Sequence, residues 1–96
     1  MAKAYWICCY RSISNPAAVA EYAKLAGPAI QKGGGRFLAR GVAAKTYEQG
    51  LAQRTIVIEF DSVQQAVATF ESDAYRAALR VIEGAAERDI RIIEGV

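Results

Sequence analysis

The chain contains no histidine among its 96 residues. Histidine is the side chain whose ordinary pKa lies nearest to neutral pH, and it is the commonest metal ligand in proteins. Its absence excludes histidine-based acid–base catalysis, histidine-ligated haem, the two-histidine iron site and most zinc sites. Any chemistry must therefore come from carboxylates, tyrosine, cysteine, lysine or arginine, or from a reactive substrate or cofactor.

Cysteine is also scarce, and the two cysteines, Cys8 and Cys9, are adjacent. Neighbouring residues of a strand point to opposite faces, so these two thiols would not share a metal ion, and a disulfide between them would strain the backbone. We interpret them as small, buried or half-buried residues, with a redox role as the alternative. The carboxylates are scattered without the spacing of a ligand set, so we expect no metal. We also expect no cofactor.

A large net charge and long apolar runs are missing as well. The 12 basic and 10 acidic residues leave a formal charge of +2, which is too balanced to indicate a nucleic-acid or membrane-surface partner. No apolar run approaches the length of a membrane span, and no signal-peptide core follows the first residues. We therefore expect a cytoplasmic protein with no membrane segment.

Hydrophobic residues make up 53% of the chain, which predicts a packed core, and the length fits one domain over residues 1–96. Alternating and helical patterns divide this domain into segments. The predicted strands are residues 4–11, 36–41, 54–60 and 88–94. A first helix is expected from Asn15-Pro16 to the Gly33–Gly35 cluster, with a kink or restart at Gly27-Pro28. A second helical region begins at Ser62, breaks at Ser72-Asp73 and ends near Gly84. Residues 42–53 are less regular and are expected to form a connecting arm or a long hairpin.

This order of strands and helices, βαββαβ, is the split βαβ or ferredoxin-like pattern of an α+β fold. Right-handed crossovers place the helices on one side of a four-stranded antiparallel sheet and leave the other side open. Strict alternation assigns six residues to that open face: Arg36, Leu38, Arg40, Thr55, Val57 and Glu59. In suitable register, Arg40 and Glu59 would pair across the strands.

An open face of this kind exposes more apolar surface than most monomers tolerate, because both faces of the first strand are substantially apolar. The simplest cover is a second copy of the same surface, so we expect a homodimer. The charged residues would then line a cleft beside the open sheet face, where a ligand would bind. The alternative is that they only form ion pairs within the dimer interface.

Seven segments together form a recognisable pattern: Ala4-Tyr5-Trp6-Ile7, Asn15-Pro16, Gly34–Gly41, Val57–Ser62, Phe70, Ser72–Tyr75 and Ile93–Gly95. In these segments the chain resembles the bacterial family known as domain of unknown function 1330. That family is similar to the dimeric α/β-barrel superfamily, which implies a ferredoxin-like homodimer joined through open sheet faces. The superfamily includes cofactor-independent monooxygenases, lactone isomerases, aldoxime dehydratases and haem-handling enzymes, and the haem branches depend on the histidine that this chain lacks.

The leading functional hypothesis is a small-molecule site that binds or transforms an aromatic or acidic metabolite. Arg36 and Arg40 would hold its carboxylate or enolate oxygen. Glu59, if shielded from water, would have a raised pKa and take a proton. The stacking surface and the closing arm would come from Trp6, Tyr10 and Tyr47, with core packing and simple exposure as the alternatives.

Two other functions remain to be weighed. A structural or regulatory homodimer without turnover is favoured by the absence of a recognised nucleophile–base pair. RNA binding is disfavoured, because the outward residues expected on the third strand, Thr55, Val57 and Glu59, offer no aromatic ring for stacking bases. We therefore expect no nucleic-acid partner.

Overall fold

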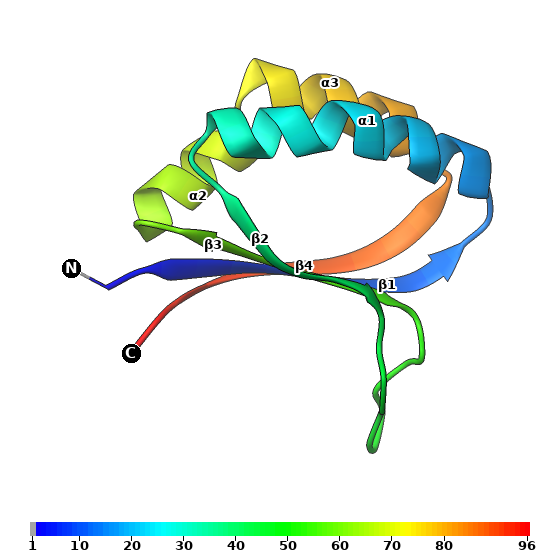
Figure 1. Ribbon diagram of the computed structural model, residues 1–96. Coiled ribbons are helices and arrows are strands. Elements are labelled where there is room, and N and C mark those ends of the chain that lie inside the picture. Colours follow the sequence, from blue (N-terminus) through cyan, green and yellow to red (C-terminus); the bar gives the residue numbers. More distant parts are fainter. Residues whose placement is uncertain (1) are drawn as a thin grey trace.

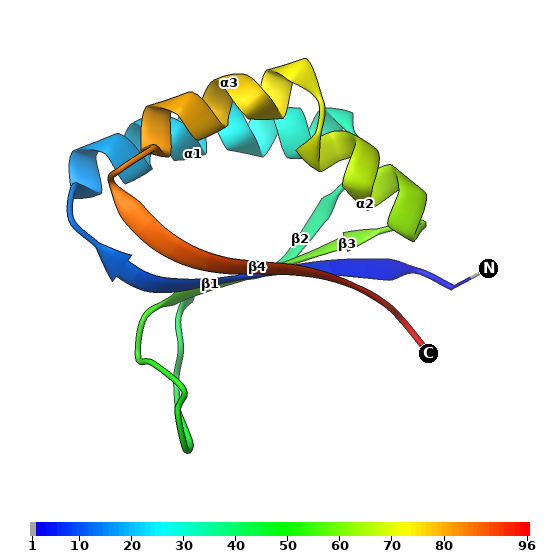
Figure 2. The same ribbon diagram turned by 180° about the vertical axis from the view of Figure 1, so that it is seen from behind.

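Four strands and three helices are arranged in two layers over residues 2–96, the part of the chain that this computed structural model describes. Their order is β1 (Ala4–Ile13), α1 (Pro16–Lys32), β2 (Arg36–Val42), β3 (Arg54–Phe60), α2 (Val63–Phe70), α3 (Asp73–Ile82) and β4 (Ala86–Glu94). All three helices lie on one face of the sheet, whereas residues 43–53, between β2 and β3, extend away from the other face (Figures 1 and 2).

The sheet has the strand order β2-β3-β1-β4, and every neighbouring pair is antiparallel. The predicted α+β, ferredoxin-like architecture is therefore confirmed. The central strands β1 and β3 pair from Ala4 opposite Phe60 to Cys9 opposite Thr55. This register places Trp6, Cys8 and Tyr10 under the helices and leaves Tyr5, Ile7 and Cys9 on the open face.

Side-chain oxygens begin each helix by accepting a backbone N–H that has no partner within the helix. Asn15 accepts from Ala18 N at 3.2 Å, Ser62 from Gln65 N at 3.1 Å and Ser72 from Tyr75 N at 3.2 Å. These are the helix starts that the sequence predicts. After α1, the turn into β2 uses Gly34 at φ +94°, a backbone conformation that residues with a Cβ rarely adopt.

Helix α1 continues through Gly27 and Pro28 to Lys32, so the helix does not end and restart at this point. Proline inside a helix removes one hydrogen bond and costs about 3 kcal/mol. Tyr22 and Ala26 on one side of Pro28, and Ile30 on the other, are all buried against the sheet or α3. Burial along the whole inner side of α1 therefore outweighs the local preference to break.

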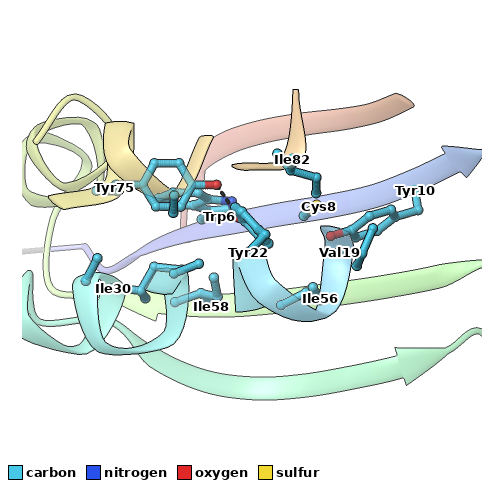
Figure 3. Packing of buried hydrophobic residues seen from close by; sticks show 14 of the residues in the cluster. Trp6, Cys8, Tyr10, Val19, Tyr22, Ile30, Ile56, Ile58, Tyr75 and Ile82 are labelled. Atoms are coloured by element: carbon cyan, nitrogen blue, oxygen red, sulfur yellow. Dashed lines mark hydrogen bonds between the residues drawn. The ribbon is translucent and has the colours of Figure 1, made fainter. Parts of the chain in front are cut away.

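Aromatic rings fill the centre of the core between the sheet and the helices. The Trp6 side chain is 1% exposed, and its ring centroid lies 6.0 Å from Phe60, 5.3 Å from Phe70 and 5.0 Å from Tyr75. Figure 3 shows Trp6 beside Tyr75, whose hydroxyl is hydrogen-bonded to that of Tyr22. The core-packing alternative for Trp6 therefore describes its surroundings well.

Candidate functional site

A β-bulge in β2 decides which way its arginines point. Phe37 lies opposite Ile58, but Ala39 lies opposite Val57 and Arg40 opposite Ile56, so Leu38 is an extra residue in the strand. One added residue reverses the alternation of every side chain beyond it. Arg40 consequently shares the helix-facing side with Ile56, and the prediction that it lies on the open face and pairs with Glu59 is wrong.

Arg36 precedes the bulge and takes the role expected of Arg40. It lies directly opposite Glu59, and its Nε donates to Glu59 Oε1 at 3.1 Å while Nη2 donates to Asp61 Oδ1 at 2.9 Å. Tyr5 OH donates to the other oxygen of Glu59 at 3.1 Å, and Lys3 Nζ bonds Asp61 at 3.3 Å. The charges at this corner of the open face are therefore paired with one another inside the protomer.

The environment of Glu59 differs from the expected one. Partial burial tends to raise the pKa of Glu59, but the hydrogen bonds from Arg36 and Tyr5 outweigh it and hold the pKa below the usual value. Asp61 likewise has a lowered pKa because Arg36 and Lys3 bond to its carboxylate. The expected raised pKa of Glu59 is therefore wrong, and its carboxylate is fully ionised at neutral pH.

Substituting Arg36→Gln should raise the pKa of both carboxyl groups towards their ordinary values. Because folding lowers these pKa values, their stabilising contribution is complete at neutral pH and is lost as pH falls through the folded-state pKa values. The variant should therefore lose less of its remaining stability on acidification. NMR titration of the side-chain carboxyl carbons measures the pKa values of Glu59 and Asp61. An unchanged Glu59 pKa in the variant would contradict the ion pair between Arg36 and Glu59 as the cause of the shift.

An apolar cavity lies on the helix-facing side, between α1 and strands β1, β2 and β3. Its volume is about 40 Å³, which holds about three water molecules or an apolar group of roughly four heavy atoms. The lining residues are mostly apolar: Trp6, Cys8, Tyr10, Val19, Tyr22, Ala23, Ala26, Gly27, Ile30, Phe37, Arg40, Arg54, Ile56 and Ile58. Several of them are visible in Figure 3 between the sheet and α1. Three predicted site residues, Trp6, Tyr10 and Arg40, thus meet in one place.

Two arginines supply the charge of this cavity. Arg40 is exposed, with its guanidinium carbon 4.7 Å from the centre of the Phe37 ring, and Arg54 is half-buried. Within residues 2–96, neither arginine forms an ion pair with a carboxylate. Sequence reasoning missed Arg54, although alternation from Ile56 and Ile58 places it on the helix-facing side.

A polar cluster lies deeper in the core. Arg88 Nη1 donates to Tyr22 OH at 2.9 Å, the Tyr22 and Tyr75 hydroxyls are hydrogen-bonded, and the Arg88 guanidinium lies over the rings of Tyr10 and Tyr22 at 5.6 and 4.7 Å. Burial raises the pKa of Tyr75, with the neighbouring Tyr22 adding to the shift, so Tyr75 is a neutral hydroxyl. Burial opposes the charge of Arg88, but the tyrosines outweigh it and raise its pKa. The cluster ties α1, α3 and β4 together.

Tyr47 lies apart from both of these regions. Its side chain is 76% exposed on the arm, with Lys45 Nζ 5.9 Å from the ring centre. It borders a groove of about 470 Å³ on the open face, together with Cys9, Arg11 and Thr55. The predicted site residues therefore fall into three places: the helix-side cavity, the Arg36–Glu59 cluster and the arm.

The described residues contain no group of three or more cysteine and acidic side chains placed to hold a metal ion. Among these same residues, no helix has both the length and the apolar character needed to cross a lipid bilayer.

A comparison with protein families matches residues 3–96 to the domain of unknown function DUF1330. The chain belongs to the DUF1330 family. The resemblance that the sequence motifs indicate is therefore confirmed over almost the whole chain. No curated protein sequence matches this DUF1330 chain.

Solved structures with the same fold are distant in sequence. A protein of unknown function from Rhodopseudomonas palustris is 16% identical, with a TM-score of 0.78 over 99% of this chain and 83% of that one. A dimeric ferredoxin-like protein from Thermobifida fusca is 17% identical, with a TM-score of 0.67 over 98% and 92%. A candidate antibiotic biosynthesis monooxygenase from Nitrosomonas europaea is 14% identical, with a TM-score of 0.64 over 99% and 90%. At such identities the similarity establishes the ferredoxin-like fold of the DUF1330 chain.

Proposed function

We propose that this protein is a homodimer in which each protomer binds a small acidic metabolite in the cavity between α1 and the sheet. One observation carries the ligand proposal: the cavity walled by Trp6 and Tyr10 is also bordered by arginines that form no ion pair with a carboxylate of residues 2–96. Small-molecule sites are mostly apolar with a few charged groups and typically measure about 300–1,000 Å³, so a cavity of about 40 Å³ admits only a short apolar part of a ligand. The acid group would bond to Arg40, and the apolar part would enter the cavity.

The dimer proposal rests on the uncovered face of the sheet. Ile7 and Val57 lie opposite each other at its centre, and Ile93 nearby on β4 is 57% exposed. The helices cover only the other face (Figures 1 and 2). A second copy facing the first would bury these side chains around a two-fold axis. The protein from Thermobifida fusca, which has the same fold, is dimeric, and this supports the association of two copies.

The paired charges of the open face favour an interface over a ligand site there. Arg36, Glu59 and Asp61 satisfy one another, so an acid arriving at Arg36 would have to displace existing ion pairs. This favours the proposal that the Arg36–Glu59 cluster belongs to the dimer contact and that the ligand occupies the helix side.

The substitution Gly27→Leu tests the ligand proposal. Gly27 lines the cavity, and a Cβ built on it meets no atom within 4 Å, so a side chain can begin there without a clash, and leucine is chosen to fill the cavity. We expect isocaproate, a branched six-carbon acid, to bind the wild type saturably in isothermal titration calorimetry. The leucine variant should bind it at least about tenfold more weakly, because its side chain occupies the space of the ligand tail.

Gly27→Ala is the matched control, because it adds one methyl group and leaves most of the cavity open. Both variants should fold within about 1 kcal/mol of the wild type, since the gain from replacing a helical glycine is offset by the strain of a Cβ before Pro28. Isocaproate binding that is equal in the wild type, Gly27→Ala and Gly27→Leu would contradict the cavity as the site.

A further inference from the structure

The two arginines of the cavity rim are neighbours on the sheet. Arg40 lies opposite Ile56, and Val42 lies opposite Arg54, so Arg40 and Arg54 are diagonal partners on the helix-facing side of β2 and β3. Such residues are about 7–8 Å apart at their backbones, which is within reach of two long side chains that bond the same group. Both residues border the same cavity.

Their charge is not balanced locally. Like charges on neighbouring positions repel, and this repulsion is stronger beside an apolar wall than in open water. Among the residues described, no carboxylate forms an ion pair with either Arg40 or Arg54, whereas Arg36 on the opposite face has two such partners. A ligand that places two negative charges between the two guanidinium groups would remove the repulsion and gain two charge-assisted contacts.

We infer that the ligand is a compact dianion with a short apolar tail, and that Arg40 and Arg54 bind its two charges jointly. This inference rests on the proposed function. The shared chemistry is that of a dicarboxylate with both carboxyl groups on one carbon or of a phosphate monoester. The cavity limits the tail to roughly four heavy atoms, which is the size of an isobutyl group.

Three probes with matched tails test the charge of the ligand. Isobutylmalonate carries two carboxylates, isobutyl phosphate carries a phosphate and isocaproate carries one carboxylate, while the isobutyl tail is common to all three. At mildly alkaline pH, where the first two are dianions, calorimetry on the wild-type protein should show at least one of them binding about tenfold or more tightly than isocaproate. Which dianion binds more tightly distinguishes a dicarboxylate ligand from a phosphate ester.

Arg54→Gln and Arg40→Gln test the residues. Each should weaken binding of the preferred dianion by about tenfold or more and reduce its advantage over isocaproate. Arg80→Gln is the matched control, because it removes an equal charge from an exposed position on α3 outside the cavity lining. It should leave the preference unchanged. Arg40 is exposed, so Arg40→Gln provides the test even if Arg54→Gln folds poorly.

The outcomes separate the two proposals. Isocaproate binding that is sensitive to Gly27→Leu, with dianions no tighter, would overturn the dianion inference and leave the small-acid site standing. A dianion preference that survives both arginine substitutions would overturn the role of Arg40 and Arg54. Binding of none of the three probes would overturn both proposals.

Discussion

Replacing Trp6 by alanine is expected to lower the free energy of unfolding by about 3–5 kcal/mol. The Trp6 ring is 1% exposed and packs against Phe60, Phe70 and Tyr75. Its removal leaves a cavity between the sheet and the helices, and the surrounding side chains cannot move far enough to fill it. A loss of this size is a large share of the total stability of a small protein, about 5–15 kcal/mol. Urea denaturation followed by far-UV circular dichroism measures the change.

Trp6→Phe and Ile7→Ala are the controls for this prediction. Phenylalanine keeps one ring in place and should cost clearly less than alanine. Ile7 is the next residue along β1 and points to the open face, so Ile7→Ala should have a smaller effect on the stability of the protomer. An effect of Trp6→Ala below about 1 kcal/mol would be incompatible with the central position of this ring.

Replacing Ile7 by aspartate is expected to dissociate the homodimer. Ile7 lies between Val57 and Arg91 at the middle of the uncovered face, and the two-fold axis would bury the new carboxylate in both copies. Arg91 is already bonded to Asp89 through both Nε and Nη2, so the new carboxylate would have to compete for this cation. Burying a charge without its own partner costs about 3–5 kcal/mol, so the dissociation constant should rise at least about a hundredfold. Sedimentation velocity over a range of protein concentrations measures the shift, and circular dichroism shows whether the protomer stays folded.

Leu25→Asp is the matched control for the dimer. Leu25 is 47% exposed on α1, on the opposite side of the molecule from the open face, so the same change in charge should leave the association state unaltered. Dissociation by both substitutions would indicate a general effect of charge. A wild-type protein that sediments as a monomer at micromolar concentration would contradict the dimer itself.

The sequence predicts some of the residues that line the candidate cavity, but not the face of the sheet on which they lie. Trp6, Tyr10 and Arg40 were singled out for their chemistry, and they do border one cavity, but on the face opposite to the one expected for Arg40. The error has one cause, because the pattern of β2 does not reveal the extra residue at Leu38. Arg54 was within reach of the alternation argument, since it shares the parity of Ile56 and Ile58.

The sequence does not predict the half-buried environment of Arg88. On β4 it reads as one of several charged residues in an alternating strand, which usually indicates solvent exposure. Its half-buried position depends on Tyr10 from β1 and Tyr22 from α1, two residues remote from it along the chain. Such an environment exists only after the strands and helices have packed.

The amino-acid sequence by itself determined the order of strands and helices, the capping residues that begin each helix, the glycine turn before β2, and the exclusion of histidine chemistry. These properties depend on side chains that act within a few residues of one another, by alternation, capping or backbone freedom. Only the tertiary structure decided the bulge, the face on which Arg40 lies, the pairing of Arg36 with Glu59 and the cavity under α1. Strand register and cavities depend on contacts between segments far apart in the chain, so a local pattern does not specify them.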